Sequence, residues 1–363
     1  MVDSLMKILI TGGAGFIGSR LSAELVQQGH DVTIFDSLHP QVHFQNETNF
    51  RIAKSSGAGM IVGDVRSRDD MQRAMSQVRP EFIFHLAAET GTGQSFDHPT
   101  RYNEVNIIGT TNLIEAVRAA DTPVRRIILA GSRSVYGEGA CVDANNVLVP
   151  AVARTSQDMS NGDFLPKSAS GETLTPVPTN ADTCPVAPAS IYASTKLMQE
   201  YLLTQAFWGT PTEVGILRLQ NVYGPGQSMS NPYTGVISIF ADQIMQGKTL
   251  NIFEDGDITR DFVYVDDVVR AFASTVALDS FSDQIVDIGA GEAATIIDVA
   301  RQLIGLVGDA RNGVQVTGDF RAGDIRYALA DISKARRLLN WSPQVSVRDG
   351  LNQFSTWAKK EQG

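Results

Sequence analysis

Short apolar runs alternate with amphipathic stretches through the first 220 residues of the chain. Five runs predict strands because they are apolar along most of their length: residues 6–10, 31–36, 58–65, 81–89 and 125–132. Apolar residues at helical spacing predict helices at residues 15–29, 67–78, 100–120 and 190–207. Apolar strands separated by helices are typical of a parallel sheet covered on both faces. We therefore predict a Rossmann-type doubly wound α/β domain over residues 6–220.

Two parts of the chain depart from this pattern. Residues 138–189 are rich in Pro, Ser, Thr, Asn and Gly and are too long for an ordinary loop. They predict an insertion that either edges a site or is a solvated excursion. Beyond residue 220, shorter elements at residues 236–247, 249–254, 266–277, 284–290, 296–307 and 333–339 predict a smaller C-terminal α/β lobe. This lobe should occupy most of residues 221–361, with some chain returning to the first domain.

Composition excludes several classes of protein. The 363 residues carry a formal net charge of -10, which disfavours a general nucleic-acid binder. The chain start has no secretory leader, and no apolar run approaches the roughly 18–20 residues of a membrane span. The two cysteines, Cys141 and Cys184, are too few for a disulfide framework or a metal cluster. We expect a cytoplasmic protein without a bound metal or a membrane anchor.

A glycine-rich turn lies between the first predicted strand and the first predicted helix. Gly12, Gly15 and Gly18 are spaced G-x-x-G-x-x-G, and the turn also fits G-x-G-x-x-G. Asp36 ends the second predicted strand, where a carboxylate accepts hydrogen bonds from a nucleotide ribose. That carboxylate would repel a 2'-phosphate, and the following "SLHP" has no arginine to hold one. The pattern therefore predicts a dinucleotide site that prefers NAD over NADP, with Asp64 at the adenine end.

Three further residues predict chemistry at a carbinol carbon. Tyr192 and Lys196 lie four residues apart, so they share one face of the predicted helix. A nearby ammonium favours the phenolate that tyrosine needs to act as a base. Ser132 ends the fifth predicted strand, at the edge where open α/β sheets place their ligands. A serine hydroxyl there can hydrogen-bond a substrate oxygen as charge develops on it.

The motifs together resemble the extended short-chain dehydrogenase/reductase family, in its nucleotide-sugar epimerase/dehydratase branch. The resemblance runs from about Lys7 to Trp341 and rests on "TGGAGFIG", "HLAAE", "VNIIGT", "SVYG", "YASTK", "LRLQNVYGPGQ" and "RDFVYVDDV". It implies Ser132, Tyr192 and Lys196 as the catalytic set, and Asn106 as a support within the active-site helix. It also implies NAD as cofactor and a nucleotide-diphosphate sugar as substrate.

The predicted site residues fall into two sets. The cofactor set, which includes Tyr192 and Lys196, is Gly12, Gly15, Phe16, Ile17, Gly18, Asp36, Asp64, Val65, Leu86, Ala87, Ala88 and Asn106. The substrate set is Thr90, Thr92, Gln94, Ser132, Arg133, Ser134, Asn221, Tyr233, Thr234, Phe253, Arg260, Arg321 and Asp324. Guanidinium groups suit the diphosphate, because their planar forks match phosphate oxygens.

The resemblance also bears on the reaction. In the 4,6-dehydratases of this branch an Asp-Glu pair follows the catalytic hydroxyl residue, whereas this chain has Arg133 and Ser134 there. Neither is a carboxylic acid, which favours 4-epimerisation through a transient 4-keto sugar. Several segments are similar to the dTDP-L-rhamnose 4-epimerases, which form dTDP-6-deoxy-L-talose for surface polysaccharides. UDP-glucose or UDP-N-acetylhexosamine 4-epimerases and, from another class, a non-catalytic NAD-binding scaffold or redox sensor are the alternatives. The family also implies a homodimer through the helices at residues 100–120 and 190–207.

Overall fold

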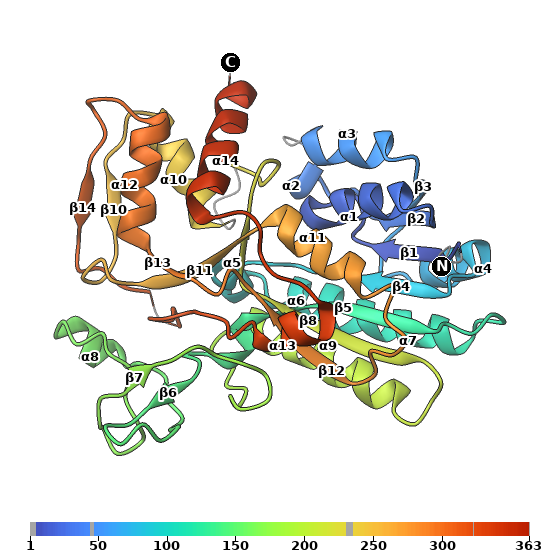
Figure 1. The fold of residues 1–363 in the computed structure, drawn as a ribbon, viewed down its shortest axis with the longest axis horizontal. Coiled ribbons are helices and arrows are strands. Elements are labelled where there is room, and N and C mark those ends of the chain that lie inside the picture. The colour runs from blue at the N-terminus through green and yellow to red at the C-terminus, as the bar shows by residue number, and fades with distance from the viewer. Residues whose placement is uncertain (1–4, 44–46, 230–234, 322, 363) are drawn as a thin grey trace.

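Seven parallel strands form the central sheet of the computed structural model, which describes residues 5–43, 47–229, 235–321 and 323–362. The strand order is β12-β8-β5-β4-β1-β2-β3 (Figure 1). The strands are β1 (Lys7–Thr11), β2 (Asp31–Asp36), β3 (Gly59–Val62), β4 (Phe82–His85), β5 (Arg126–Ser132), β8 (Glu213–Leu219) and β12 (Gln284–Ile288). The chain extends the sheet from β1 in both directions, so a crevice opens between the ends of β1 and β4. The predicted fold class is confirmed.

Helices cover both faces of this sheet, as its apolar strands require. Successive strand residues point to opposite faces, so Ile8 packs in one core and Leu9 in the other. The first core receives α1 (Phe16–Gln27), α11 (Val265–Ser274) and α13 (Ser333–Leu339). The second receives α4 (Arg68–Val78), α7 (Gly109–Arg118) and α9 (Ile191–Phe207). The short helices α2 (Pro40–His43) and α3 (Glu47–Ser55) join β2 to β3.

The single helix predicted at residues 100–120 is wrong in detail. The chain forms α5 (Thr92–Asp97), α6 (Pro99–Tyr102), a π-helical segment η1 (Asn103–Ile108) and then α7. Asn106 lies fully buried within η1, and its side-chain amide bonds the backbone of Glu89 and the hydroxyl of Thr195. These bonds hold Asn106 toward the sheet edge and account for the local widening of the helix, a distortion common near functional sites.

The smaller lobe has its own core beside the carboxyl ends of the sheet. Its strands are β9 (Asn221–Tyr223), β10 (Leu250–Ile252), β11 (Thr259–Tyr264), β13 (Ala293–Thr295) and β14 (Val314–Val316). Its helices are α10 (Val236–Met245), α12 (Ile296–Val307) and α14 (Val347–Gln362). Phe240, Leu250, Val299 and Phe354 from these elements meet in one apolar cluster. The later segments α11, β12 and α13 pack on or join the main sheet, where some returning chain was expected.

The insertion at residues 138–189 is a packed segment and not a solvated excursion. It contains β6 (Cys141–Val142), α8 (Ser156–Ser160) and β7 (Thr175–Pro176), and β6 pairs with β7 (Figure 1). Phe164 and Leu174 are buried within it. The backbone of Thr179 bonds those of Leu329 and Asp331 at 2.9 Å each, which ties the insertion to the C-terminal part of the chain. The insertion therefore edges the region between the main sheet and the smaller lobe.

Both cysteines of the insertion are free and buried thiols. Burial raises the pKa of Cys141 to about 12 and that of Cys184 to about 11. Both are therefore protonated at neutral pH, and neither has the thiolate character of a reactive cysteine.

Candidate active site

A cavity of about 910 Å³ lies at the carboxyl edge of the sheet, between the sheet and the smaller lobe. Its walls come from the turn before α1, the ends of β2, β4 and β5, the start of α9, and the smaller lobe. It brings together Gly12, Gly15, Phe16, Ile17, Gly18, Asp36, Asp64, Val65, Leu86, Ala87, Ala88, Thr90, Thr92, Ser132, Arg133, Ser134, Tyr192, Lys196, Asn221, Phe253, Arg260, Arg321 and Asp324.

Among the described residues, two of the predicted site residues do not line this cavity. Asn106 lies behind the wall and supports it through Glu89 and Thr195. Gln94 is buried, and its side-chain oxygen lies 3.4 Å from the hydroxyl of Tyr102. Tyr233 and Thr234 fall outside the described residues.

The glycine turn packs so closely against neighbouring backbone that Gly12 and Gly18 have no space for a side chain. Gly12 has a φ of +69°, and a Cβ there would lie 2.8 Å from the backbone nitrogen of Ala87. A Cβ on Gly18 would lie 2.4 Å from the carbonyl oxygen of Gly12. Helix α1 begins directly after Gly15, and its first turn has no acidic side chain. The helix N-terminus is therefore available to an anionic group, so this turn fits a dinucleotide.

Asp36 is held firmly at the end of β2. Its carboxylate accepts hydrogen bonds from the backbone of Ala14 at 3.0 Å and of Leu38 at 2.8 Å. Oδ1 also lies 3.4 Å from Nε2 of His43, while Oδ2 has a further lone pair for a ribose hydroxyl. Asp64 is differently placed, because Arg66 already binds its carboxylate at 2.6–3.1 Å. Asp36 therefore fits the ribose, while Asp64 presents an ion pair to the adenine end.

Ser132 and Tyr192 lie side by side in the cavity wall. Ser132 caps the 3-10 helix η2 (Arg133–Tyr136), and its Oγ lies 2.8 Å from that of Ser134. Burial raises the pKa of Tyr192, and a hydrogen bond with Ser132 acts in the opposite direction. The ring of Tyr102 packs edge-on against Tyr192 with centroids 6.3 Å apart. Tyr192 is therefore an oriented phenol that needs a nearby positive charge to ionise at neutral pH.

Lys196 belongs to a buried polar chain that the sequence motifs did not reveal. Its ammonium donates to Oε1 of Gln199 at 2.5 Å, and Nε2 of Gln199 donates to Oγ1 of Thr110 at 2.9 Å. Thr110 also lies 3.0 Å from Nε2 of His85, whose Nδ1 lies 2.7 Å from Oγ1 of Thr11. Every member is buried. The chain connects the lysine to the glycine turn that follows Thr11.

Burial controls the charge of the two titratable members of this chain. It lowers the pKa of Lys196 to about 8, although Glu200 acts against the shift. Burial and the charge of Lys196 lower the pKa of His85 to about 3, so the imidazole is neutral at physiological pH. A neutral imidazole both donates and accepts one hydrogen bond, as its two threonine neighbours require. The sequence does contain a signal for His85, because it is a polar residue at the end of an apolar predicted strand.

Arg133 is a buried cation in the same wall. Its NH2 donates to the carbonyl of Gly137 at 3.0 Å, and its Nε has no hydrogen-bond partner among the described residues. Burial and the neighbouring Arg260 lower the pKa of Arg133 to about 10, so it stays charged at neutral pH. Arg133 therefore offers the cavity a positive charge with unused hydrogen-bonding capacity.

The predicted sugar-nucleotide residues come from the smaller lobe. Arg260 donates to the carboxylate of Asp324 at 2.7 Å, and its side chain is nearly buried. The guanidinium of Arg321 lies 4.8 Å from the ring centre of Phe253. Asn221 begins β9, which pairs in parallel with β11. This wall combines two guanidinium groups with an aromatic ring, a combination that suits a nucleoside diphosphate.

Fold and site together define a dinucleotide-binding α/β protein with a serine, tyrosine and lysine set at the sheet edge. The family model described as "NAD dependent epimerase/dehydratase family" matches residues 8–157 and 165–289. The chain is 40% identical to a dTDP-L-rhamnose 4-epimerase of Burkholderia thailandensis, across 98% of this chain and 95% of the relative. It is 32% identical to a UDP-glucose 4-epimerase of Mycolicibacterium smegmatis, across 95% of this chain and 96% of the relative.

Solved structures agree with these relatives. A UDP-glucose 4-epimerase of Thermotoga maritima, solved with UDP-glucose, has a TM-score of 0.78 and 29% identity, across 99% of this chain and 100% of that chain. A UDP-glucuronic acid 4-epimerase of Bacillus cereus, solved with UDP-glucuronic acid and NAD, has a TM-score of 0.79 and 27% identity, across 98% and 99%. The chain belongs to the NAD dependent epimerase/dehydratase family, as the motifs predicted.

The described residues contain neither a candidate membrane span nor a candidate metal site. No helix in the described ranges has the length and apolar character that crossing a membrane requires. No group of three or more His, Cys, Asp or Glu side chains in those ranges is arranged to hold a metal ion.

Proposed function

We propose that the protein is an NAD-dependent nucleotide-sugar 4-epimerase that interconverts dTDP-L-rhamnose and dTDP-6-deoxy-L-talose. The observation that carries this proposal is the meeting of Ser132, Tyr192 and Lys196 in one cavity with the glycine turn and Arg260. A scaffold that only binds NAD would not need this set. The sugar is proposed because of the 40% identity to the relative with that name.

The residues divide the chemistry of the 4-hydroxyl among themselves. When bound, NAD supplies reversible oxidation at the sugar carbon that carries this hydroxyl. The phenolate of Tyr192 takes the proton of this hydroxyl. Tyr192 returns a proton after the sugar has rotated to present its opposite face. Lys196 favours the phenolate by its positive charge, and Ser132 hydrogen-bonds the sugar oxygen. The same residues act in the oxidation and in the reduction of the sugar carbon. Their protonation states are therefore restored at the end of each catalytic cycle.

We further propose a division of labour between the two parts of the chain. Residues 6–220 hold NAD through the glycine turn and Asp36, and residues 221–361 mainly hold the sugar nucleotide. In this arrangement Arg260, Arg321 and Asn221 bind the diphosphate, and Phe253 lies against the base. Asp324 accepts a hydrogen bond from a ribose hydroxyl with the carboxylate oxygen that Arg260 does not bind. Thr90 and Thr92 line the hexose end.

The test is incubation of the purified protein with dTDP-L-rhamnose, UDP-glucose and UDP-N-acetylglucosamine, each followed by proton NMR. The proposal expects inversion at C4 of dTDP-L-rhamnose and little reaction of the UDP sugars. Conversion of a UDP sugar alone would replace the proposed substrate with that of the second candidate, a UDP-hexose 4-epimerase. A protein that retains NAD but converts none of the three would contradict the catalytic proposal.

We also propose that the protein is a cytoplasmic homodimer that pairs through η1, α7 and α9. Three large apolar side chains are exposed on these helices: Ile108 by 49%, Met198 by 41% and Tyr201 by 44%. A second copy would cover them in a four-helix interface. Light scattering at micromolar concentration should give twice the mass of 39.2 kDa. Tyr201→Glu should shift the protein to monomer, and a wild-type monomer would contradict the proposal.

A further inference from the structure

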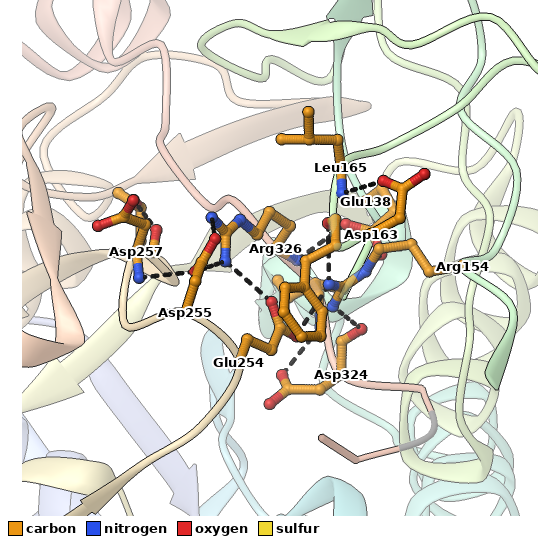
Figure 2. Close-up of polar contacts among 12 residues, drawn as sticks. Glu138, Arg154, Asp163, Leu165, Glu254, Asp255, Asp257, Asp324 and Arg326 are labelled. Atoms are coloured by element: carbon orange, nitrogen blue, oxygen red, sulfur yellow. Dashed lines mark hydrogen bonds and ion pairs between the residues drawn. The ribbon is translucent and has the colours of Figure 1, made fainter. Parts of the chain in front are cut away.

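Four charged residues form a ring between the insertion and the smaller lobe, which three ion pairs and one backbone hydrogen bond close. Glu138 and Arg154 belong to the insertion, Glu254 follows β10, and Arg326 belongs to the segment before α13 (Figure 2). Arg154 donates to Glu138 at 2.9 Å and to Glu254 at 2.8 Å. Arg326 completes the ring, because its guanidinium donates to Glu254 at 3.0 Å and its backbone nitrogen donates to Glu138 at 2.9 Å. The ring joins three segments that are distant in sequence.

The ring is buried, so its members depend on one another. The side chains of Arg154 and Glu254 are 3% and 1% exposed, and those of Glu138 and Arg326 are 7% and 9% exposed. Asp255, which is more exposed, binds the outer side of Arg326. Removal of one partner from such a group leaves an uncompensated buried charge. The ring can therefore hold the backbone of its segments in one geometry.

Two of these segments carry predicted nucleotide-binding residues. The remaining guanidinium nitrogen of Arg154 donates to the backbone carbonyl of Asp324 at 2.8 Å (Figure 2). Asp324 in turn binds Arg260. Glu254 directly follows Phe253, and it has a φ of +55°, which few non-glycine residues adopt. Its bonds to Arg154 and Arg326 hold it in that conformation. One arginine thus contacts both sides of the proposed nucleotide wall.

Arg154 itself is not among the residues that line the cavity. We propose that Arg154 is a positioning residue through which the insertion shapes the sugar-nucleotide site. This inference rests on the proposed function for the identity of the ligand. In it, the insertion fixes the loop of Phe253 and the segment of Asp324 before the ligand arrives, and Asp324 in turn binds Arg260 of β11. Binding then does not have to order these segments, and the affinity for the nucleoside diphosphate is higher.

The experiment compares Arg154→Met with wild type in two assays. Epimerisation of dTDP-L-rhamnose gives KM and kcat, and calorimetric titration with dTDP gives Kd without turnover. Loss of the charge-assisted hydrogen bonds of Arg154 to Glu138, Glu254 and the carbonyl of Asp324 should raise both KM and Kd by about tenfold to a hundredfold. The kcat at saturation and the NAD content should stay within about twofold, because the groups around Ser132 and Tyr192 are not changed.

Two further variants separate positioning from simple stabilisation. Lys167→Met is the matched control, because Lys167 also forms ion pairs, with Asp158 and Asp163, and both partners lie within the insertion. It should leave KM and Kd unchanged even if it lowers the melting temperature. Arg154→Lys keeps the charge but cannot reach all of its partners, so it should give intermediate values. If Arg154→Met does not fold, the KM and Kd of Arg154→Lys are compared with wild type in its place.

The outcomes distinguish this inference from the proposed function. Wild-type KM and Kd in folded Arg154→Met would overturn the inference while the enzyme stays an epimerase. An equal rise in Lys167→Met would overturn it as well, because the effect would then belong to the stability of the insertion. If wild type binds dTDP but converts no sugar, the proposed function fails, and the titrations still decide the role of Arg154. If wild type binds neither dTDP nor UDP, both proposals fail.

Discussion

Replacement of Gln199 by methionine should move the pH dependence of catalysis. Gln199 is fully buried and supplies the acceptor for the ammonium of Lys196 at 2.5 Å. Methionine has a similar volume and lacks a strong acceptor, so the change tests the hydrogen bond more than the packing. The other charged neighbours are not altered: Glu200 remains bound to Arg218, and His85 remains neutral.

The size of the shift follows from the lost bond. A hydrogen bond to a charged group contributes about 1.5–3 kcal/mol, and one pKa unit corresponds to about 1.36 kcal/mol. The bond favours the protonated form, so its loss should lower the pKa of Lys196 by about one to two units. The starting value is about 8. At pH 8 the protonated fraction should then fall from about one half to between about 1% and 10%.

The assay is kcat for epimerisation, measured from pH 5.5 to 9.5 with the NAD content checked at each end. Because the ammonium form of Lys196 favours the Tyr192 phenolate, the alkaline limb of the Gln199→Met profile should move to lower pH by about one to two units. Gln199→Glu, which keeps an acceptor and adds a negative charge, should move the limb upward. An unshifted limb in folded, NAD-loaded Gln199→Met would refute the role assigned to Gln199.

Stability gives a second measure of the same shift. Folding lowers the pKa of Lys196 from 10.5 to about 8, so the unfolded chain binds more protons between these pH values. The contribution of Lys196 to the free energy of unfolding therefore rises with pH across this window and is flat below it. In Gln199→Met the rise should begin about one to two pH units lower. Urea unfolding at several pH values, compared with wild type, measures this onset.

Three other substitutions test separate parts of the structure. Tyr192→Phe should lower kcat by roughly a hundredfold or more while NAD stays bound, and a near-normal rate would contradict its role as the base. Gly18→Ala should abolish NAD retention, measured by absorbance after denaturation, because the new Cβ would lie 2.4 Å from the carbonyl of Gly12. Arg126→Met should lower the free energy of unfolding by about 1–3 kcal/mol in urea, because the buried backbone carbonyl of Thr275 loses its donor at 2.5 Å, while kcat of the folded enzyme stays unchanged.

The sheet and the glycine turn were predictable because their signals are local. Ile8, Leu9 and Ile10 are apolar on both faces, which requires a sheet covered on both sides. The turn carries its own geometric requirement, since Gly12 needs a positive φ and Gly18 has no room for a Cβ. The turn can be recognised from Gly12 to Gly18 alone, and each strand from its own apolar run, while the parallel sheet follows from the alternation of strands and helices.

Features that depend on distant partners were not predictable in the same way. The π-helical segment around Asn106 depends on Glu89 and Thr195, which are 17 and 89 residues away. Arg154 and Glu254 are 100 residues apart, and no local pattern relates them. The sequence of the insertion was ambiguous for this reason. Its polar composition suits a solvated loop, and the burial of Arg154 depends on partners that only the folded chain brings together.

The groups around Ser132 argue for proton transfer at one sugar hydroxyl. Elimination of water at a second carbon would need a further acid or base, and the next residue, Arg133, keeps its proton because its pKa is about 10. The nearby carboxylate of Glu89, which lines the same cavity, is bound by Arg101 at 2.7 Å. Among the described residues next to Ser132, the wall can hold sugar oxygens but offers no carboxyl group without an ion-pair partner to exchange protons with them. Tyr192 is then left as the proton-transfer group, which permits inversion at the oxidised carbon and disfavours dehydration.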